Sequence, residues 1–182
     1  MSFTFKPSDL PEVIIVESKI FPDDRGLFAE NYKASDFKAN GITPDFVQDN
    51  FSVSKKGVIR GLHYQLNPQA QGKLVSVFFG KIWDVAVDVR KSSPNFGKFV
   101  GVELSAENST MLYIPAGFAH GFAVLSDEAR VLYKTTNEFS LAHDRGILYS
   151  DPALKIPWPV ESPIVSAKDQ KMPNLTDAEI FE

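Results

Sequence analysis

The sequence predicts an all-β fold in which many short strands form a sandwich or a barrel. Candidate strands recur near residues 13–16, 27–32, 46–54, 58–64, 73–79, 82–90, 98–104, 110–114, 120–125 and 129–136. Turns such as residues 91–97, which include Pro94 and Gly97, separate them, and this spacing is typical of sandwiches and barrels. Strands do not alternate with helices, so we do not expect a doubly wound fold.

One short helix and an irregular C-terminal segment complete the expected fold. We expect Ser35 to cap a helix that runs through Asn40 and ends at Gly41. The last thirty or so residues should form loops and short helical turns packed on the barrel, because they contain Pro152, Pro157, Pro159, Pro163 and Pro173. No internal linker or repeat is visible, so residues 1–182 should form a single domain.

Composition excludes several classes of function. The net charge is −4, so no broad basic surface is expected and nucleic acid is not an expected partner. Cysteine is absent, which excludes disulfides and thiolate metal sites and fits a reducing, cytoplasmic location. We expect no signal peptide and no membrane partner, since no stretch approaches the roughly 20 apolar residues of a membrane span.

The alternation of side chains along the strands indicates where polar groups point. Lys73 shares the more apolar face of its strand with Val75, which suggests a lysine at the mouth of the barrel. Asp84 and Asp88 lie on the other face of their strand from Trp83 and Val85, so both should face solvent or a polar pocket.

Arg60 and His63 would lie on opposite faces of a regular strand. If both serve one site, Gly61 should mark a bulge or a bend between them.

The chain has only three histidines, and His63 is the strongest candidate for chemistry. A lone histidine is usually a satisfied core residue. Here Arg60, Gln65 and Lys73 also place polar groups in apolar strands, where burial without a purpose is costly. We therefore interpret His63 as a catalytic base.

His120 lies in the pattern Pro115-x-Gly117-x-x-His120, a turn into a strand that resembles the cupin jelly rolls. Metal-binding cupins carry a second histidine two positions after the first, where this chain has Gln65. Too few ligands remain for a convincing metal site, so we expect no metal. A metal-dependent cupin oxygenase stays an alternative that Gln65 argues against.

The segment from Asp23 to Glu30 could be a solvated hairpin turn or part of a binding site. Arg25 suits a phosphate or carboxylate, and Glu30 suits a sugar hydroxyl or a base edge. Phe21 and Phe28 could provide an aromatic surface for a base.

Taken together, several segments resemble the dTDP-4-dehydrorhamnose 3,5-epimerase family, in order and over residues 12–175. They are residues 25–30, 46–50, 57–65, 71–75, 84–90, 92–98, 114–122, 131–136 and 166–169. The chain departs from the family at Phe51, often histidine, at Glu138, often tyrosine, and at Asp144, usually glutamate.

The resemblance implies a cupin-like jelly roll, a homodimer, no cofactor, and a role in dTDP-L-rhamnose synthesis. The substrate would be dTDP-4-dehydro-6-deoxy-α-D-glucose, inverted at C3 and C5 of the hexose. By family motif His63 is the base, Tyr133 the proton donor, Lys73 the group that stabilises the enolate, and Asp169 the residue that orients His63. Substrate contacts would come from Arg25, Glu30, Gln48, Asp49, Asn50, Arg60, His120, Asp144 and Lys168, with Phe139 stacked on the thymine.

The residue types fit this chemistry. A proton beside a ketone can be removed only if charge on the neighbouring oxygen is stabilised, and preorganised electrostatics is usually the largest catalytic term. Lys73 can supply that charge, while His63 and Tyr133 could act on opposite faces of the sugar. An enzyme that inverts only C3 or only C5 stays open, as does a non-catalytic cupin that binds sugar nucleotides.

Overall fold

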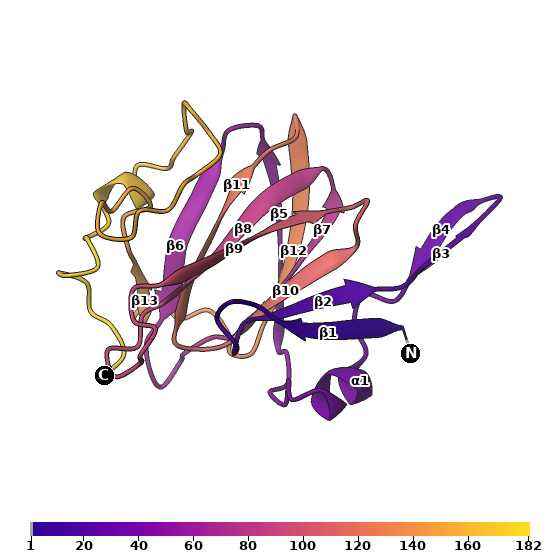
Figure 1. Ribbon diagram of the computed structural model, residues 1–182. Helices are drawn as coiled ribbons and strands as arrows, with labels where there is room; N and C mark the ends of the chain where they lie inside the picture. The colour runs from indigo at the N-terminus through magenta and orange to yellow at the C-terminus, as the bar shows by residue number, and fades with distance from the viewer. Residues whose placement is uncertain (1) are drawn as a thin grey trace.

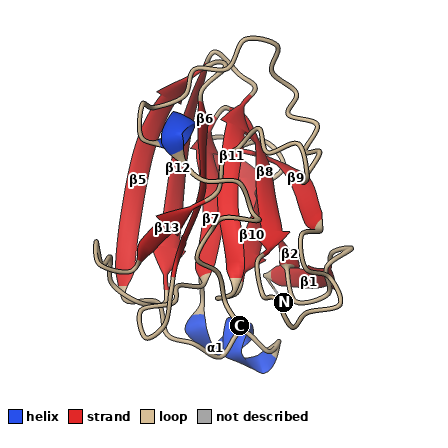
Figure 2. Ribbon diagram, turned by 90° about the vertical axis from the view of Figure 1, so that its left-hand side faces the viewer, coloured by secondary structure: helices blue, strands red, loops and turns tan. Residues whose placement is uncertain are grey.

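The computed structural model describes residues 2–182 and consists mainly of two antiparallel sheets (Figure 1). The first contains, in spatial order, β1 (Phe3–Pro7), β2 (Ile14–Ser18), β10 (Thr110–Ile114), β7 (Lys73–Phe79), β12 (Glu128–Thr135) and β5 (Gln48–Lys55). The second contains β13 (Asp144–Gly146), β6 (Ile59–Gln65), β11 (Phe118–Val124), β8 (Lys81–Asp88) and β9 (Phe99–Ser105). The all-β prediction is confirmed, and the view in Figure 2 shows how completely strands dominate.

The predicted strands are present, and three short ones were missed. They are β1, β13 and β3 (Ile20–Asp23), which pairs with β4 (Gly26–Ala29) in a separate hairpin. β1 and β13 lie at the edges of their sheets, where partners far along the chain decide whether a short segment pairs. The β3–β4 hairpin projects away from both sheets (Figure 1).

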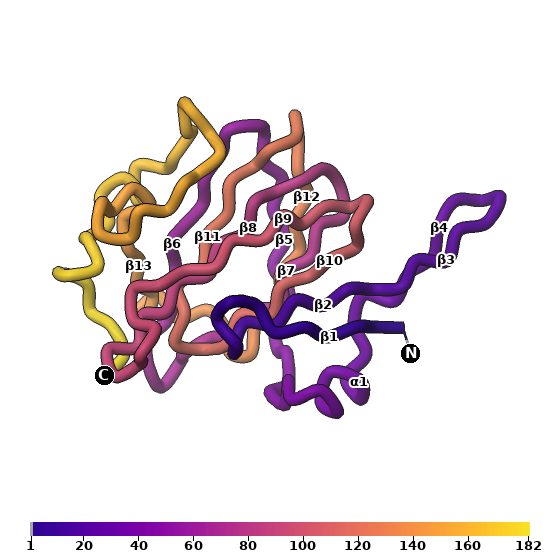
Figure 3. The backbone as a smooth tube through the Cα atoms, viewed as in Figure 1, coloured from indigo at the N-terminus to yellow at the C-terminus, as the bar shows by residue number. Residues whose placement is uncertain are grey.

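Two apolar layers enclose the second sheet. Between the sheets, alternate residues such as Val75, Ala86 and Val131 form the main core. On the outer face Val85 and Val87 are fully buried, and each stabilises the fold by about 1.5–3 kcal/mol. The C-terminal segment covers this outer face, and its path beside β6 and β13 is visible in the trace of Figure 3.

Asp84 and Asp88 point to the opposite side from Val85 and Val87, as the alternation predicts, but neither faces solvent. Asp88 is fully buried and accepts hydrogen bonds from Arg90 and Ser93. Arg90 also donates to Glu12, 3.0 Å away, so one network joins β8 to the turn before β2.

The helix α1 (Ala34–Ala39) begins two residues earlier than predicted, and Ser35 does not cap it. Lys33 occupies the N-cap without a side-chain hydrogen bond, and the Ser35 hydroxyl contacts Asp36 instead. Packing decides the start, because Phe37 is fully buried against the aromatic rings of β1. Gly41 follows the helix with φ of +87°, as predicted. In residues 2–182 no helix is both long and apolar enough to span a membrane.

The bend predicted at Gly61 is confirmed. The pairing of β6 with β11 shifts register between His120 and Phe122, and Gly61 has φ of +119°. A Cβ atom on Gly61 would lie 2.5 Å from the Gly121 Cα. Because of this irregularity Arg60 and His63 line the same cavity.

Gly61→Ala should destabilise the protein by about 2–5 kcal/mol, because the methyl group combines a disfavoured backbone conformation with a steric clash. Urea unfolding measures the change. Gly26→Ala is the matched control: its φ is +131°, but nothing lies within 4 Å of the added Cβ. It should cost only about 1–2 kcal/mol. If Gly61→Ala and Gly26→Ala lowered the free energy of unfolding equally, the contact of Gly61 with Gly121 would have no steric role.

Candidate active site

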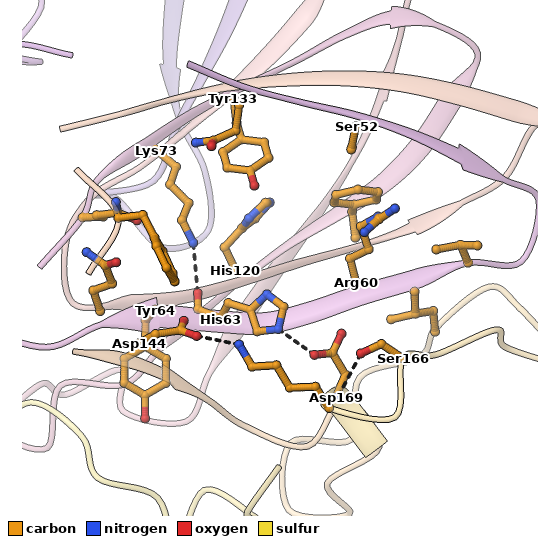
Figure 4. Close-up of a pocket in the computed structure, with 18 of the residues that line it drawn as sticks. Ser52, Arg60, His63, Tyr64, Lys73, His120, Tyr133, Asp144, Ser166 and Asp169 are labelled. Carbon is orange, nitrogen blue, oxygen red and sulfur yellow. Dashed lines mark hydrogen bonds and ion pairs between the residues drawn. The ribbon is translucent and has the colours of Figure 1, made fainter. Parts of the chain in front are cut away.

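A cavity of about 680 Å³ opens between the two sheets and the C-terminal segment (Figure 4). Its polar lining comes from all three parts of the fold. The first sheet contributes Gln48, Asn50, Ser52, Lys73 and Tyr133, the second contributes Arg60, His63, Gln65, His120 and Asp144, and the C-terminal segment contributes Ser166, Lys168 and Asp169. Most of the predicted site residues, separated along the chain, therefore meet in one place.

His63 and Asp169 form a hydrogen-bonded pair on one wall of the cavity. His63 Nε2 lies 2.8 Å from Asp169 Oδ1. Burial would raise the pKa of Asp169, but hydrogen bonds from His63, the Gly61 N–H and Ser166 outweigh it and lower the pKa. A carboxylate can only accept, so Nε2 carries a hydrogen, and in the neutral imidazole Nδ1 is then the nitrogen with the free lone pair. His63 is thereby oriented as a base.

The turn that carries Asp169 is short and irregular. The 3₁₀ helix η1 (Asp169–Lys171) follows Ser166, whose hydroxyl accepts a hydrogen bond from the Asp169 N–H at 3.0 Å. Ser166 was not predicted as a site residue. A serine three residues before a buried acid is a recognisable turn signal, but nothing in the chain indicates that this turn reaches β6.

Lys73 begins β7 with only 8% of its surface exposed. Its Nζ donates a hydrogen bond to the His63 carbonyl at 3.1 Å, which leaves further N–H donors for an oxygen in the cavity. Burial lowers the pKa of Lys73 to about 8, although the Asp144 and Asp84 carboxylates oppose the shift. Below that pH the cavity holds a poorly solvated cation.

Tyr133 lies on β12, across the cavity from His63 (Figure 4). Burial raises the pKa of Tyr133, against the opposing effect of Arg60. The phenol therefore stays protonated at neutral pH and can act as an acid. His63 and Tyr133 therefore face the same cavity from different sheets.

A second histidine–carboxylate pair joins His120 of the cavity lining to Asp84, which is fully buried. His120 Nε2 is 2.7 Å from Asp84 Oδ1, and both side chains are buried. Asp84 Oδ2 has no hydrogen-bond partner among residues 2–182. Strand alternation allowed for a polar pocket around Asp84, but pairing with His120 depends on the register of β8 with β11.

Strand β5 presents a row of polar side chains to the cavity. Gln48, Asn50 and Ser52 alternate along it, and Ser54 accepts a hydrogen bond from Arg60 Nε at 3.0 Å. The Ser52 hydroxyl is buried without a partner among the described residues. Ser52 was missed, although its place in a period-two polar row could have identified it.

Charged and aromatic side chains border the cavity. Lys168 Nζ lies 2.5 Å from Asp144 Oδ2, and this ion pair joins the C-terminal segment to β13. Arg60 stays exposed rather than buried, and the Phe139 side chain is 57% exposed. These groups are open to a ligand that enters the cavity.

Three predicted substrate contacts lie outside the cavity of this chain. Arg25 is at the tip of the β3–β4 hairpin, paired with Asp23, and Glu30 follows that hairpin. Asp49 pairs with Lys134 at 2.9 Å and alternates with the cavity residues of β5. Within residues 2–182, no three His, Asp or Glu side chains are grouped so as to hold a metal ion.

Comparisons with known proteins agree with the geometry. A family model described as dTDP-4-dehydrorhamnose 3,5-epimerase matches residues 7–177. A Shigella flexneri protein of that name is 55% identical and aligns with 96% of this chain and 97% of its own length.

Two solved structures are similar throughout. The epimerase of that name from Sulfolobus tokodaii superposes with a TM-score of 0.94 at 49% identity, covering 100% of both chains. A Legionella pneumophila 3,5-epimerase, solved with dTDP-4-keto-L-rhamnose, gives a TM-score of 0.93 at 48% identity, covering 96% of this chain and 93% of that one.

Proposed function

Because the chain belongs to the dTDP-4-dehydrorhamnose 3,5-epimerase family, we propose that it inverts C3 and C5 of dTDP-4-dehydro-6-deoxy-α-D-glucose. The product is dTDP-4-dehydro-β-L-rhamnose, in the cytoplasmic route to dTDP-L-rhamnose. The observation that carries the proposal is the placement of His63 and Tyr133 on opposite walls of one cavity, with the buried cation of Lys73 in the same space.

His63 removes the proton from the carbon next to the C4 ketone. A proton next to a ketone is far less acidic than an imidazolium, so its transfer to the imidazole is steeply uphill in free energy. Lys73 reduces this barrier by stabilising the negative charge that develops on the C4 oxygen. Asp169 holds the imidazole in the tautomer that can accept the proton. The reaction uses only side chains of the protein.

Tyr133 returns a proton to the opposite face of the same carbon. Inversion requires this second proton source, since reprotonation by His63 would restore the starting configuration. General acids of this kind contribute about 10²–10⁴-fold in rate. Once His63 has released its proton to water and the Tyr133 phenolate has taken one up, the two steps repeat at the other carbon next to the ketone and complete the double inversion.

The nucleotide is held by the remaining groups around the cavity. Arg60 and Lys168 offset the charge of the diphosphate, and His120 lies beside Tyr133, with ring centroids 6.5 Å apart. Phe139 stacks on the thymine. Gln48, Asn50 and Asp144 provide polar contacts on the cavity wall.

We also propose a homodimer in which each hairpin serves the cavity of the other chain. Phe51, Val53 and Phe79 are each more than half exposed on the outer face of the first sheet, where a second copy can cover them. Arg25 and Glu30 lie on or beside a projecting hairpin, too far out to serve their own cavity. In the dimer these two residues reach the partner's substrate.

Incubation with the 4-keto sugar nucleotide in D₂O should place deuterium at both C3 and C5. NMR measures the deuterium at each carbon. His63→Asn should slow this exchange by on the order of 10³-fold, because the amide cannot take up the proton that the imidazole accepts. His143→Asn, which changes a histidine outside the cavity, should leave exchange intact.

Tyr133→Phe separates the acid from the base. It should keep exchange at the first carbon yet lose net inversion. Exchange at one carbon only in the wild type would identify a mono-epimerase, and exchange at neither would contradict the proposed function.

The rate of epimerisation should fall as pH rises through about 8, where Lys73 loses its charge. The rate falls as pH rises because only the protonated amine of Lys73 stabilises the enolate, and the neutral amine does not. Lys73→Arg keeps a positive charge at all accessible pH values and should remove this decline while reducing the maximal rate. A wild-type rate that stays constant between pH 7 and pH 10 would exclude the cation from this role.

Subunit complementation tests the dimer. Arg25→Ala and His63→Asn proteins should each be nearly inactive. After subunit exchange, half of the dimers are mixed and carry one intact site, so about a quarter of the wild-type rate should return. No recovery, in a mixture shown by mass spectrometry to contain mixed dimers, would place Arg25 in its own chain's site.

A further inference from the structure

The segment that carries Phe139 is held by glutamine side chains at one end of the barrel. Gln48 begins β5, Gln65 ends β6, and Gln71 lies just before β7; we call these three the glutamine set. Each side chain bonds the backbone of residues 137–140, the segment that follows β12.

Gln65 makes the central contacts of the glutamine set. Its Oε1 accepts a hydrogen bond from the Ser140 N–H at 2.7 Å, and its Nε2 donates to the Glu138 carbonyl at 3.2 Å. Nε2 also donates to the Gln69 carbonyl at 2.7 Å. Gln65 is only 2% exposed, so its donors and acceptor are engaged with backbone and not with solvent.

Gln48 and Gln71 hold the remaining residues of the segment. Gln48 Oε1 accepts from the Phe139 N–H at 2.8 Å, and Gln71 Nε2 donates to the Asn137 carbonyl at 2.6 Å. The main chain on both sides of Phe139 is therefore fixed, while its ring stays exposed beside the cavity. An exposed aromatic ring on a fixed backbone loses little conformational freedom when a ligand stacks on it.

The members of the glutamine set lie on, or just before, strands that carry groups of the site. Each glutamine is two residues from a group of the site. Gln65 follows His63 on β6, Gln48 precedes Asn50 on β5, and Gln71 precedes Lys73, the first residue of β7. The position of the Phe139 ring is thereby tied to the positions of the base and the cation. A nucleotide stacked on Phe139 is placed at a set distance from His63.

We propose that Gln65 is a positioning residue that acts through Phe139 to place the nucleobase. The assignment of the base to Phe139 rests on the proposed function. An amide is required because Gln65 must donate to one carbonyl of the segment and accept from an N–H of the same segment. A hydrocarbon of similar size leaves these buried groups unpaired, so the segment and the Phe139 ring lose their fixed position.

The test is a double-mutant cycle on dTDP binding, measured by calorimetry. Phe139→Ala should weaken binding by on the order of tenfold, the usual effect of losing one base–aromatic stack. Gln65→Met should weaken it by several-fold, and the double variant should bind no more weakly than Phe139→Ala alone. The matched control is Gln69→Met, the same change in a side chain outside the glutamine set, which should bind like the wild type.

Turnover provides a second readout that a purely structural role would not produce. Gln65→Met should raise KM for the sugar nucleotide several-fold with kcat within about threefold of the wild type, because remote binding is lost and the acid–base groups remain. Additive losses in the cycle, or a loss of kcat with unchanged dTDP affinity, would overturn the proposal. If Gln65→Met does not fold, the same cycle with Gln71→Met tests the glutamine set.

Failure of this inference is distinguishable from failure of the proposed function. The cycle uses dTDP and needs no turnover, so a wild type that binds dTDP without exchanging substrate protons contradicts epimerisation and still tests Gln65. Unchanged dTDP affinity in Phe139→Ala overturns the positioning role while epimerisation stands. A wild type that does not bind dTDP overturns both.

Discussion

The cavity depends on the close approach of β6 and β11 at Gly61 and Gly121. A Cβ atom on Gly121 would lie 2.7 Å from the Arg60 carbonyl and 3.2 Å from the Gly61 Cα, so both positions exclude side chains. This contact allows the shift in register between the strands. Without the shift, Arg60 and His63 would point to opposite faces of the sheet, and one of them would leave the cavity.

Three of the charged or titratable groups in the cavity are stabilised there by defined hydrogen-bond partners. His63 is held by Asp169, His120 by Asp84, and Lys73 donates to a backbone carbonyl. Burial keeps Lys73 only weakly basic and Tyr133 protonated. The same low-dielectric surroundings that make these groups costly to bury also strengthen their effect on charge that develops in a substrate.

Much of this arrangement could be predicted from the sequence, because a strand has a period of two and a barrel has one interior. That rule placed Lys73 inward and required a bend at Gly61, and the structure agrees. The rule failed where contacts between distant parts of the chain determine the structure. Buried Phe37, and not Ser35, determines where the helix starts. The partner of Asp84 depends on strand register, and the outward position of Arg25 depends on a hairpin whose direction no local signal encodes.

The position of the C-terminal segment affects the order in which the protein folds during its own synthesis. Asp169 is made after every strand of both sheets, since the last of them, β13, ends at Gly146. A nascent chain can pair its strands before Asp169 has left the ribosome, but His63 then lacks its carboxylate partner. The segment also covers the outer face of the second sheet. Docking of this segment therefore covers the apolar surface and places Asp169 beside His63 in one event.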